Sequence, residues 1–169
     1  MRSDASSLDE ARFCTIHRHP VLVSLEVDAG LLKPITGAQG PGTMRHLQTA
    51  QASFAPSVVQ YVTLDHHVSP PTSRWISIGR TSENDVAVND YAVSRHHARF
   101  RFVEGAGYVI EDLESVNGTA VDGDWIDTSE PVGIRSGQRL RFGRLSFTFM
   151  RPEDFYSFLV ALVPMNPSE

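Results

Sequence analysis

Apolar and polar residues alternate with a period of two along much of the chain from Trp75 onward. Phe100 and Phe102 alternate with arginines, and so do Leu140 and Phe142. A second run of the same kind follows at Leu145, Phe147 and Phe149. Because successive side chains of a strand point to opposite faces, this pattern predicts short strands, each with one buried face.

Turn signals that contain glycine separate these runs. They stand at Gly105-Ala106-Gly107, Asn117-Gly118, Asp122-Gly123 and Ser136-Gly137. Glycine and asparagine accept the positive φ angles that tight turns require. Many short strands with turns at this spacing predict an all-β fold of the two-sheet β-sandwich type.

The N-terminal part of the chain has a different pattern. The run Ser7-Leu8-Asp9-Glu10 has the form of a capping box, which predicts a short helix over about 8–17. Val21–Val27 is apolar and β-branched and predicts a strand, for which an edge position is an option. Glycines and prolines punctuate residues 30–56, which predicts a flexible linker. We therefore expect residues 1–56 to form an N-terminal extension.

The pattern changes again after Met150. Pro152 suits the first position of a helix, and apolar residues recur beyond it at helical spacing. They are Phe155, Phe158, Leu159 and Leu162. This spacing predicts an amphipathic helix packed on the sandwich, with partner binding as the alternative. We expect the sandwich to cover residues 57–150, beginning with a strand at Val58–Leu64, and a C-terminal helix and tail to cover residues 151–169.

Charge and composition exclude several classes of partner. The chain has 15 lysines and arginines against 20 aspartates and glutamates, a net charge of −5, which disfavours nucleic acid. We expect no membrane partner, because no apolar run approaches the length of a transmembrane helix. Cys14 is the only cysteine, so an internal disulfide is excluded. That fits a cytoplasmic location.

Two arginines, a hydroxyl and an amide stand at the expected ends of strands. They belong to Arg80, Ser94, Arg95 and Asn117. Guanidinium and hydroxyl groups on loops are suited to hold a phosphate monoester. By contrast, the sequence contains no catalytic triad motif, nucleotide-binding phosphate loop or metal-ligand spacing. It therefore predicts binding without catalysis, cofactor or metal.

These residues lie in segments that, in order and spacing, resemble a forkhead-associated (FHA) domain. The segments are Gly79-Arg80, Ser94-Arg95-His96-His97, Asp112–Thr119 and Gly137–Phe149. The resemblance covers Trp75–Met150 closely. It implies an eleven-stranded sandwich that reads phosphothreonine on partner proteins through the loops at one end. In the bacterial members, which the arginine-rich composition favours, it implies serine/threonine kinase signalling. The expected partner is then a phosphothreonine-containing protein, such as a kinase or its substrate.

The resemblance also implies a role for individual residues. Arg80 and Ser94 would bind the phosphate, and Arg95 would add a second cationic contact. Asn117 would bind the backbone of the peptide beside the phosphothreonine. The loops would be supported by Gly79, His97 and Gly118.

Some alternatives remain open. Arg80 could form a salt bridge with Asp85 instead of binding a ligand. Val116 stands where the family usually has threonine, and a lost hydroxyl bond costs about 0.5–1.5 kcal/mol. This residue favours a phosphate-independent scaffold on the same fold. Asp122 stands where the family often has asparagine, and its charge either disfavours acidic peptides or is screened by solvent.

Overall fold

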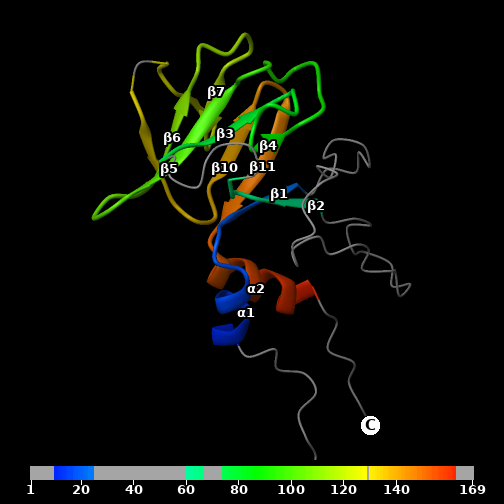
Figure 1. Ribbon diagram of the computed structural model, residues 1–169, viewed down its shortest axis with the longest axis vertical. Helices are drawn as coiled ribbons and strands as arrows, with labels where there is room; N and C mark the ends of the chain where they lie inside the picture. The colour runs from blue at the N-terminus through cyan, green and yellow to red at the C-terminus, as the bar shows by residue number, and fades with distance from the viewer. Residues whose placement is uncertain (1–9, 25–59, 67–73, 129, 163–169) are drawn as a thin grey trace, which may run out of the picture.

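The computed structural model describes residues 10–24, 60–66, 74–128 and 130–162 (Figure 1). Within them, eleven strands form two sheets. The six-stranded sheet has the order β2 (Gln60–Thr63), β1 (Val21–Ser24), β11 (Leu145–Met150), β10 (Arg139–Phe142), β7 (Thr119–Val121) and β8 (Asp124–Trp125). The five-stranded sheet has the order β4 (Val86–Ala87), β3 (Ile76–Gly79), β5 (Ala98–Val103), β6 (Gly107–Asp112) and β9 (Val132–Ile134). The strand pairs are antiparallel except β3 and β4, which run parallel.

The core lies between the two sheets. Along β10 and β11 buried and more exposed residues alternate, and Leu140 is paired with Phe147 in register. Phe100 of the opposite sheet meets Phe142 edge-on, with ring centroids 6.2 Å apart. The predicted all-β, two-sheet sandwich is therefore confirmed. Phe102 corrects the expected pattern: it is 62% exposed near the end of the β5–β6 hairpin, where it packs on Tyr108.

Strand β1 is an interior strand, which corrects the edge position considered for it. It pairs with β2 on one side and with β11 on the other, and all four of its residues are buried. Leu22 belongs to the core between the sheets, while Val21 and Val23 face a second apolar cluster outside it. Residues 21–24 are thus part of the sandwich, which begins well before residue 57.

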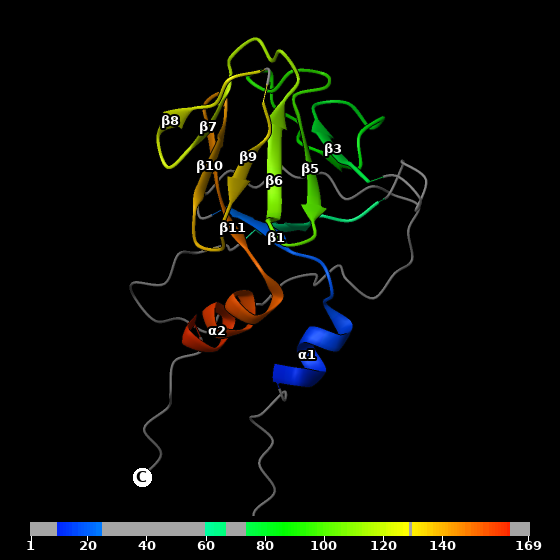
Figure 2. The same cartoon turned by 90° about the vertical axis from the view of Figure 1, so that its left-hand side faces the viewer.

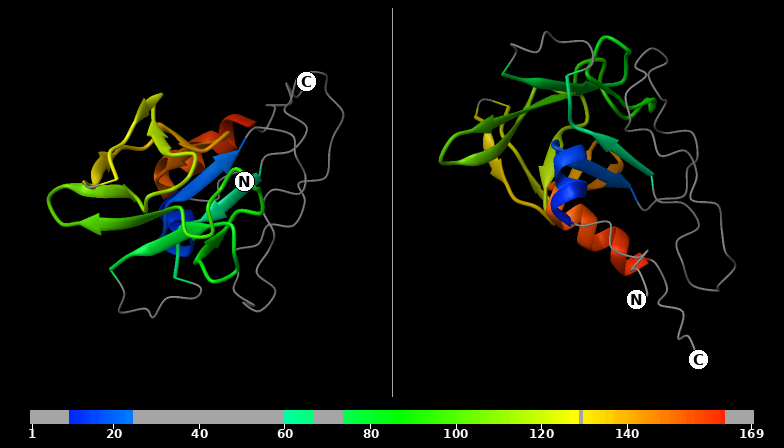
Figure 3. Two further views of the ribbon diagram at one scale, coloured as in Figure 1. Left: turned by 90° about the horizontal axis from the view of Figure 1, so that it is seen from above. Right: turned by 60° about the horizontal axis from the view of Figure 1, so that its bottom comes forward.

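Two helices supply that second cluster, α1 (Glu10–Ile16) and α2 (Pro152–Leu162). Phe13 of α1 lies 5.3 Å from Tyr156 of α2, centroid to centroid, and Phe155 lies 4.9 Å from Tyr61 of β2. Figure 2 shows both helices below the sheets, at the end opposite the loop that follows β6. The helices lie beside each other when the bottom of the molecule comes forward (Figure 3, right). The C-terminal helix therefore packs on the sandwich.

Two points concern the rest of the chain. The expected linker over residues 30–56 lies outside the described residues. In the described part, neither helix has the length and apolar character needed to cross a bilayer.

Candidate functional site

The loops after β3, before β5 and after β6 meet at one end of the sandwich (Figures 1 and 2). The loop before β5 is fixed to the end of β3 by its backbone. The N–H of Arg80 donates to the carbonyl of Ser94 at 2.9 Å, and the N–H of His97 donates to the carbonyl of Ile78 at 2.9 Å. Arg80 and Ser94 are separated along the chain, and these two bonds hold them side by side.

A hollow of about 380 Å³ opens between these loops. Its lining residues are Arg80, Tyr91, Val93, Ser94, Arg95, His96, Glu114, Val116 and Asn117. All four residues expected to contact a ligand, two arginines with a serine and an asparagine, are among them. The three residues expected to support the loops, Gly79, His97 and Gly118, lie outside the lining.

Ser94 is held by hydrogen bonds at both its backbone and its side chain. Its backbone N–H donates to Nδ1 of His97 at 2.9 Å, and its hydroxyl oxygen accepts from the backbone N–H of Val116 at 3.0 Å. A serine hydroxyl has one proton to donate in addition to the lone pairs that accept. The bond from Val116 uses a lone pair, so the proton of Ser94 can be donated to an anion in the hollow.

His97 connects the two loops from beneath. Its ring is fully buried and meets Phe142 edge-on at 5.6 Å. Because Nδ1 accepts from Ser94, the ring proton is on Nε2, which lies 3.1 Å from the carbonyl oxygen of Gly118 and donates to it. Burial lowers the pKa of His97 below its ordinary value and so favours this neutral form.

Arg80 is half-buried, and the central carbon of its guanidinium lies 5.2 Å from the centroid of the Tyr91 ring. That distance is within the range of a cation–π contact. The alternative of a salt bridge with Asp85 is not found: that carboxylate accepts from the backbone N–H and the hydroxyl of Ser77, at 2.8 and 2.9 Å. Among the described residues, the arginines in ion pairs are Arg99, Arg144 and Arg151. The charge of Arg80 is therefore available to an anion.

Asn117 joins the two loops that flank the hollow. Its amide nitrogen donates to the backbone carbonyl of Ala92 at 2.9 Å. An asparagine side chain has a second N–H and a carbonyl oxygen in addition. Its amide can therefore hold the loop and still bind the backbone of a peptide.

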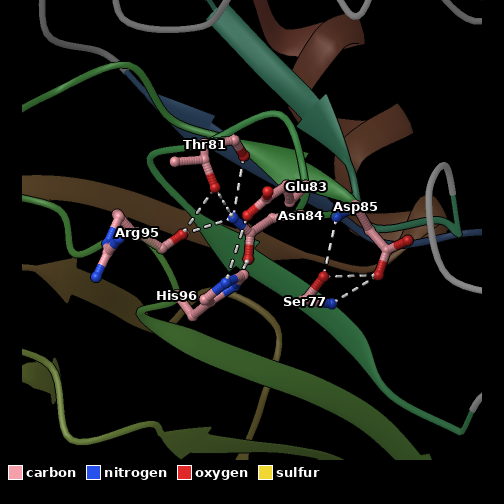
Figure 4. Close-up of polar contacts among 7 residues, drawn as sticks. All are labelled: Ser77, Thr81, Glu83, Asn84, Asp85, Arg95 and His96. Carbon is pink, nitrogen blue, oxygen red and sulfur yellow. Dashed lines mark hydrogen bonds and ion pairs between the residues drawn. The ribbon is translucent and has the colours of Figure 1, made fainter.

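Asn84, which the sequence did not single out, holds together the loop after β3 and the loop before β5 (Figure 4). It is fully buried. Its amide nitrogen donates to the backbone carbonyls of Arg95 at 2.7 Å and Thr81 at 3.0 Å, and its carbonyl oxygen lies 3.1 Å from Nδ1 of His96. Gly79 allows this close approach, because a Cβ there would clash with the carbonyl of Arg95 and lie 2.7 Å from the Asn84 nitrogen. In the sequence Asn84 is only a polar residue shortly before a strand, so its pattern did not predict this role.

Asp90 fixes the loop that carries Tyr91. It is buried, and its carboxylate accepts from the backbone N–H of Ala92 at 2.7 Å and from the guanidinium of Arg144 at 2.6 Å. The hydrogen bond from Arg144 lowers the pKa of Asp90. Since Arg144 lies in the β10–β11 turn, this ion pair anchors the loop to the opposite sheet.

Asp112 plays the corresponding part in the loop after β6. This buried carboxylate accepts from the backbone N–H and the hydroxyl of Ser115, at 2.8 and 2.7 Å, and also from the hydroxyl of Thr119. The loop between them includes Glu114 at φ 54°, in the left-handed region. Asp112 therefore sets the path along which Glu114, Val116 and Asn117 reach the hollow.

Asp122 lies away from this hollow. Its carboxylate accepts from the backbone N–H of Arg139 and the amide of Gln138, each at 2.8 Å, and these bonds lower its pKa. It lines a separate hollow beside Trp125, at the open side of the sandwich between β8 and β9.

The fold is thus a two-sheet β-sandwich with a polar hollow between the loops at one end. Residues 76–143 match the FHA domain family, which confirms the predicted resemblance for this segment. This segment includes Arg80, Ser94, Arg95 and Asn117.

Curated relatives are found in mycobacteria. The chain is 32% identical to the glycogen accumulation regulator GarA of Mycolicibacterium smegmatis over 74 residues, which cover 44% of each chain. It is 39% identical to the transcriptional regulatory protein EmbR of Mycobacterium tuberculosis over 72 residues, 43% of this chain and 18% of EmbR. A solved structure of EmbR in complex with a low affinity phosphopeptide aligns at 35% identity and a TM-score of 0.42, over 47% of this chain and 20% of that one. The chain thus spans less than half the length of these curated relatives.

Proposed function

We propose that this protein is a non-catalytic module that binds phosphothreonine on partner proteins in serine/threonine kinase signalling. The observation that carries the proposal is the meeting of Arg80, Ser94, Arg95 and Asn117 around one hollow, on loops held by buried side chains. The match of residues 76–143 to the FHA family supports it. The partner would be a phosphothreonine-containing protein, such as a kinase or its substrate.

Binding would depend on the charge of the phosphate. A phosphothreonine carries about −1.5 to −2 charges near neutral pH and three strong acceptor oxygens. Arg80 would donate charge-assisted hydrogen bonds to these oxygens, Ser94 would donate its hydroxyl proton, and Arg95 would add a second positive charge. Asn117 would bind the peptide backbone beside the phosphothreonine. An unphosphorylated threonine offers none of these acceptors, so it would bind far more weakly.

One observation favours a second candidate, a scaffold that binds partners without phosphate. Val116 lines the hollow and is 88% exposed, and it has no hydroxyl to donate to a ligand. A partner could pack an apolar side chain against Val116 without carrying a phosphate. The two candidates differ in whether removal of the phosphate abolishes binding.

Titration calorimetry with a phosphothreonine peptide library and the same peptides without phosphate tests the proposal. We expect binding of the phosphorylated peptides alone, and a loss of at least about tenfold in affinity on Arg80→Ala, because charge-assisted bonds contribute about 1.5–3 kcal/mol. Arg135→Ala is the matched control, since it removes the same charge from an exposed position outside the hollow. Equal affinity for both peptide sets would establish the scaffold instead.

A further inference from the structure

Two apolar side chains stand in solvent at the hollow. Tyr91 is 92% exposed and Val116 is 88% exposed, more than any other large hydrophobic side chain in the described part of the chain. Phe102 and Val160 lie far from the loops around the hollow, on the β5–β6 hairpin and on α2. Trp125 is 56% exposed and lies beside Gly118, but it lines the second hollow instead of this one. Apolar surface concentrated beside a polar hollow is typical of a binding surface.

The two side chains flank the same junction between loops. Tyr91 directly precedes Ala92, whose carbonyl accepts from Asn117, and Val116 directly precedes Asn117. The backbone of Val116 is also bonded to the hydroxyl of Ser94 at 3.0 Å. Both apolar side chains therefore line the hollow that contains Arg80 and Ser94.

Contacts within the protein fix the loop that carries Tyr91. Asp90 and Arg144 fix the adjoining turn, and the ring of Tyr91 lies against the guanidinium of Arg80 at 5.2 Å. The ring thus shares the hollow with the cation expected to meet the phosphate. This contact restrains the Tyr91 ring, so the ring would lose less conformational freedom when a ligand covers it.

These observations lead from the hollow to the sequence of its ligand. A phosphate held by Arg80 and Ser94 brings the neighbouring residues of the peptide over Tyr91 and Val116, since three residues span only about 10 Å. We propose that this protein selects phosphothreonine segments with an apolar side chain within three residues of the phosphothreonine, and that this side chain packs against Tyr91 and Val116. The inference rests on the proposed function and names its ligand class more closely. A polar side chain at that position of the peptide would leave the side chains of Tyr91 and Val116 exposed to water.

This inference can be tested with a series of phosphothreonine peptides. In each peptide, one of the three positions on either side of the phosphothreonine is set to leucine or to serine. We expect leucine to improve affinity about tenfold over serine in at least one position, because its burial removes apolar surface from water. Val116→Thr keeps the shape of the side chain and should reduce this preference, and Val116→Thr combined with Tyr91→Ala should abolish it. Val160→Thr, the same change on the exposed face of α2, is the matched control and should leave it intact.

The outcomes separate this inference from the proposed function. Binding that requires the phosphate but shows no preference for leucine at any position would overturn the inference alone. So would a preference that survives in the double variant. Peptides that bind equally well without phosphate, or not at all, would overturn the proposed function and this inference with it. Thermal unfolding of each variant verifies the fold, which both exposed substitutions should leave unchanged.

Discussion

The backbone N–H of Ser94 donates a hydrogen bond to Nδ1 of the buried His97 at 2.9 Å. The opposite nitrogen of the same ring is bonded to the carbonyl of Gly118 at 3.1 Å. One core side chain therefore sets the distance between the loop of Ser94 and the loop of Asn117. The hollow therefore has its shape without a ligand, which would reduce the entropic cost of the proposed binding.

The stability of the protein should fall in mild acid because of His97. Burial lowers the pKa of this histidine below its ordinary value of 6.5, so the unfolded chain takes up the proton more readily than the folded one. The contribution of neutral His97 is therefore fully present above about pH 6.5 and is lost as the pH falls below that value. Urea denaturation between pH 7.5 and 5 measures the effect.

The comparison that isolates this residue is His97→Gln, which cannot take up a proton. Its free energy of unfolding should be lower at pH 7.5 but should depend less on pH than that of the unaltered protein. His96→Gln makes the same substitution at the exposed neighbouring residue and serves as the control. An identical pH dependence for His97→Gln and the unaltered protein would contradict the assignment.

Loss of the Asn84 amide should weaken both the fold and the site. Asn84→Asp keeps the shape but turns a donor that meets the carbonyls of Thr81 and Arg95 into an acceptor. We expect a loss of about 1–3 kcal/mol in the free energy of unfolding and a lower affinity for phosphopeptide. Denaturation and titration on the same samples measure the two effects. Ser77→Ala, which removes a bond to Asp85 outside the hollow, should reduce stability while leaving affinity unchanged.

A methyl group at position 79 should be poorly tolerated. The Cβ of Gly79→Ala would clash with the carbonyl of Arg95 and press on the Asn84 amide, so the loops must move apart. We expect a loss of about 1–3 kcal/mol in stability together with weaker phosphopeptide binding. Gly133→Ala in β9 is the control, because a Cβ there meets no atom within 4 Å. Similar stability losses for the two variants would show that the crowding at Gly79 has no consequence.

Removal of the carboxylate at Glu114 should improve phosphopeptide binding. Glu114 lines the hollow with Arg80 and Arg95, and its negative charge opposes a phosphate there. Glu114→Gln keeps the size of the side chain, and we expect an affinity gain of about two- to fivefold that shrinks at high salt. Glu104→Gln, on the exposed β5–β6 turn, should give no gain. An unchanged affinity for Glu114→Gln at low salt would place its carboxylate too far from the phosphate.

The sequence predicted the parts of the fold that depend on local pattern. Alternation of apolar and polar residues located β10 and β11, in which Leu140 and Phe147 lie side by side on the buried face of one sheet. The same alternation placed Phe102 in the core, yet this residue is exposed, on the β5–β6 hairpin that projects away from the other strands (Figure 1). A period of two predicts which face a side chain takes but not how far the covering layer reaches.

Contacts between distant segments were beyond local patterns. The position of β1 between β2 and β11 depends on helices that cover its outer face, and these come from both ends of the described chain. The candidate ligand-contacting residues were named from motif order, whereas their supports were missed. Asp90 pairs with Arg144 across 54 positions, and no local signal joins them.

The sharing of the core between β1 and the helices has a practical consequence. A fragment cut to the region of family similarity, residues 76–143, would lack β1, β2 and β11, half of one sheet, together with Phe147 and Phe149. The apolar inner face of the five-stranded sheet would then be exposed to water. A fragment that folds must therefore be considerably longer than residues 76–143 and include β1, β2 and β11. Biochemical work on the loops around the hollow requires this longer fragment.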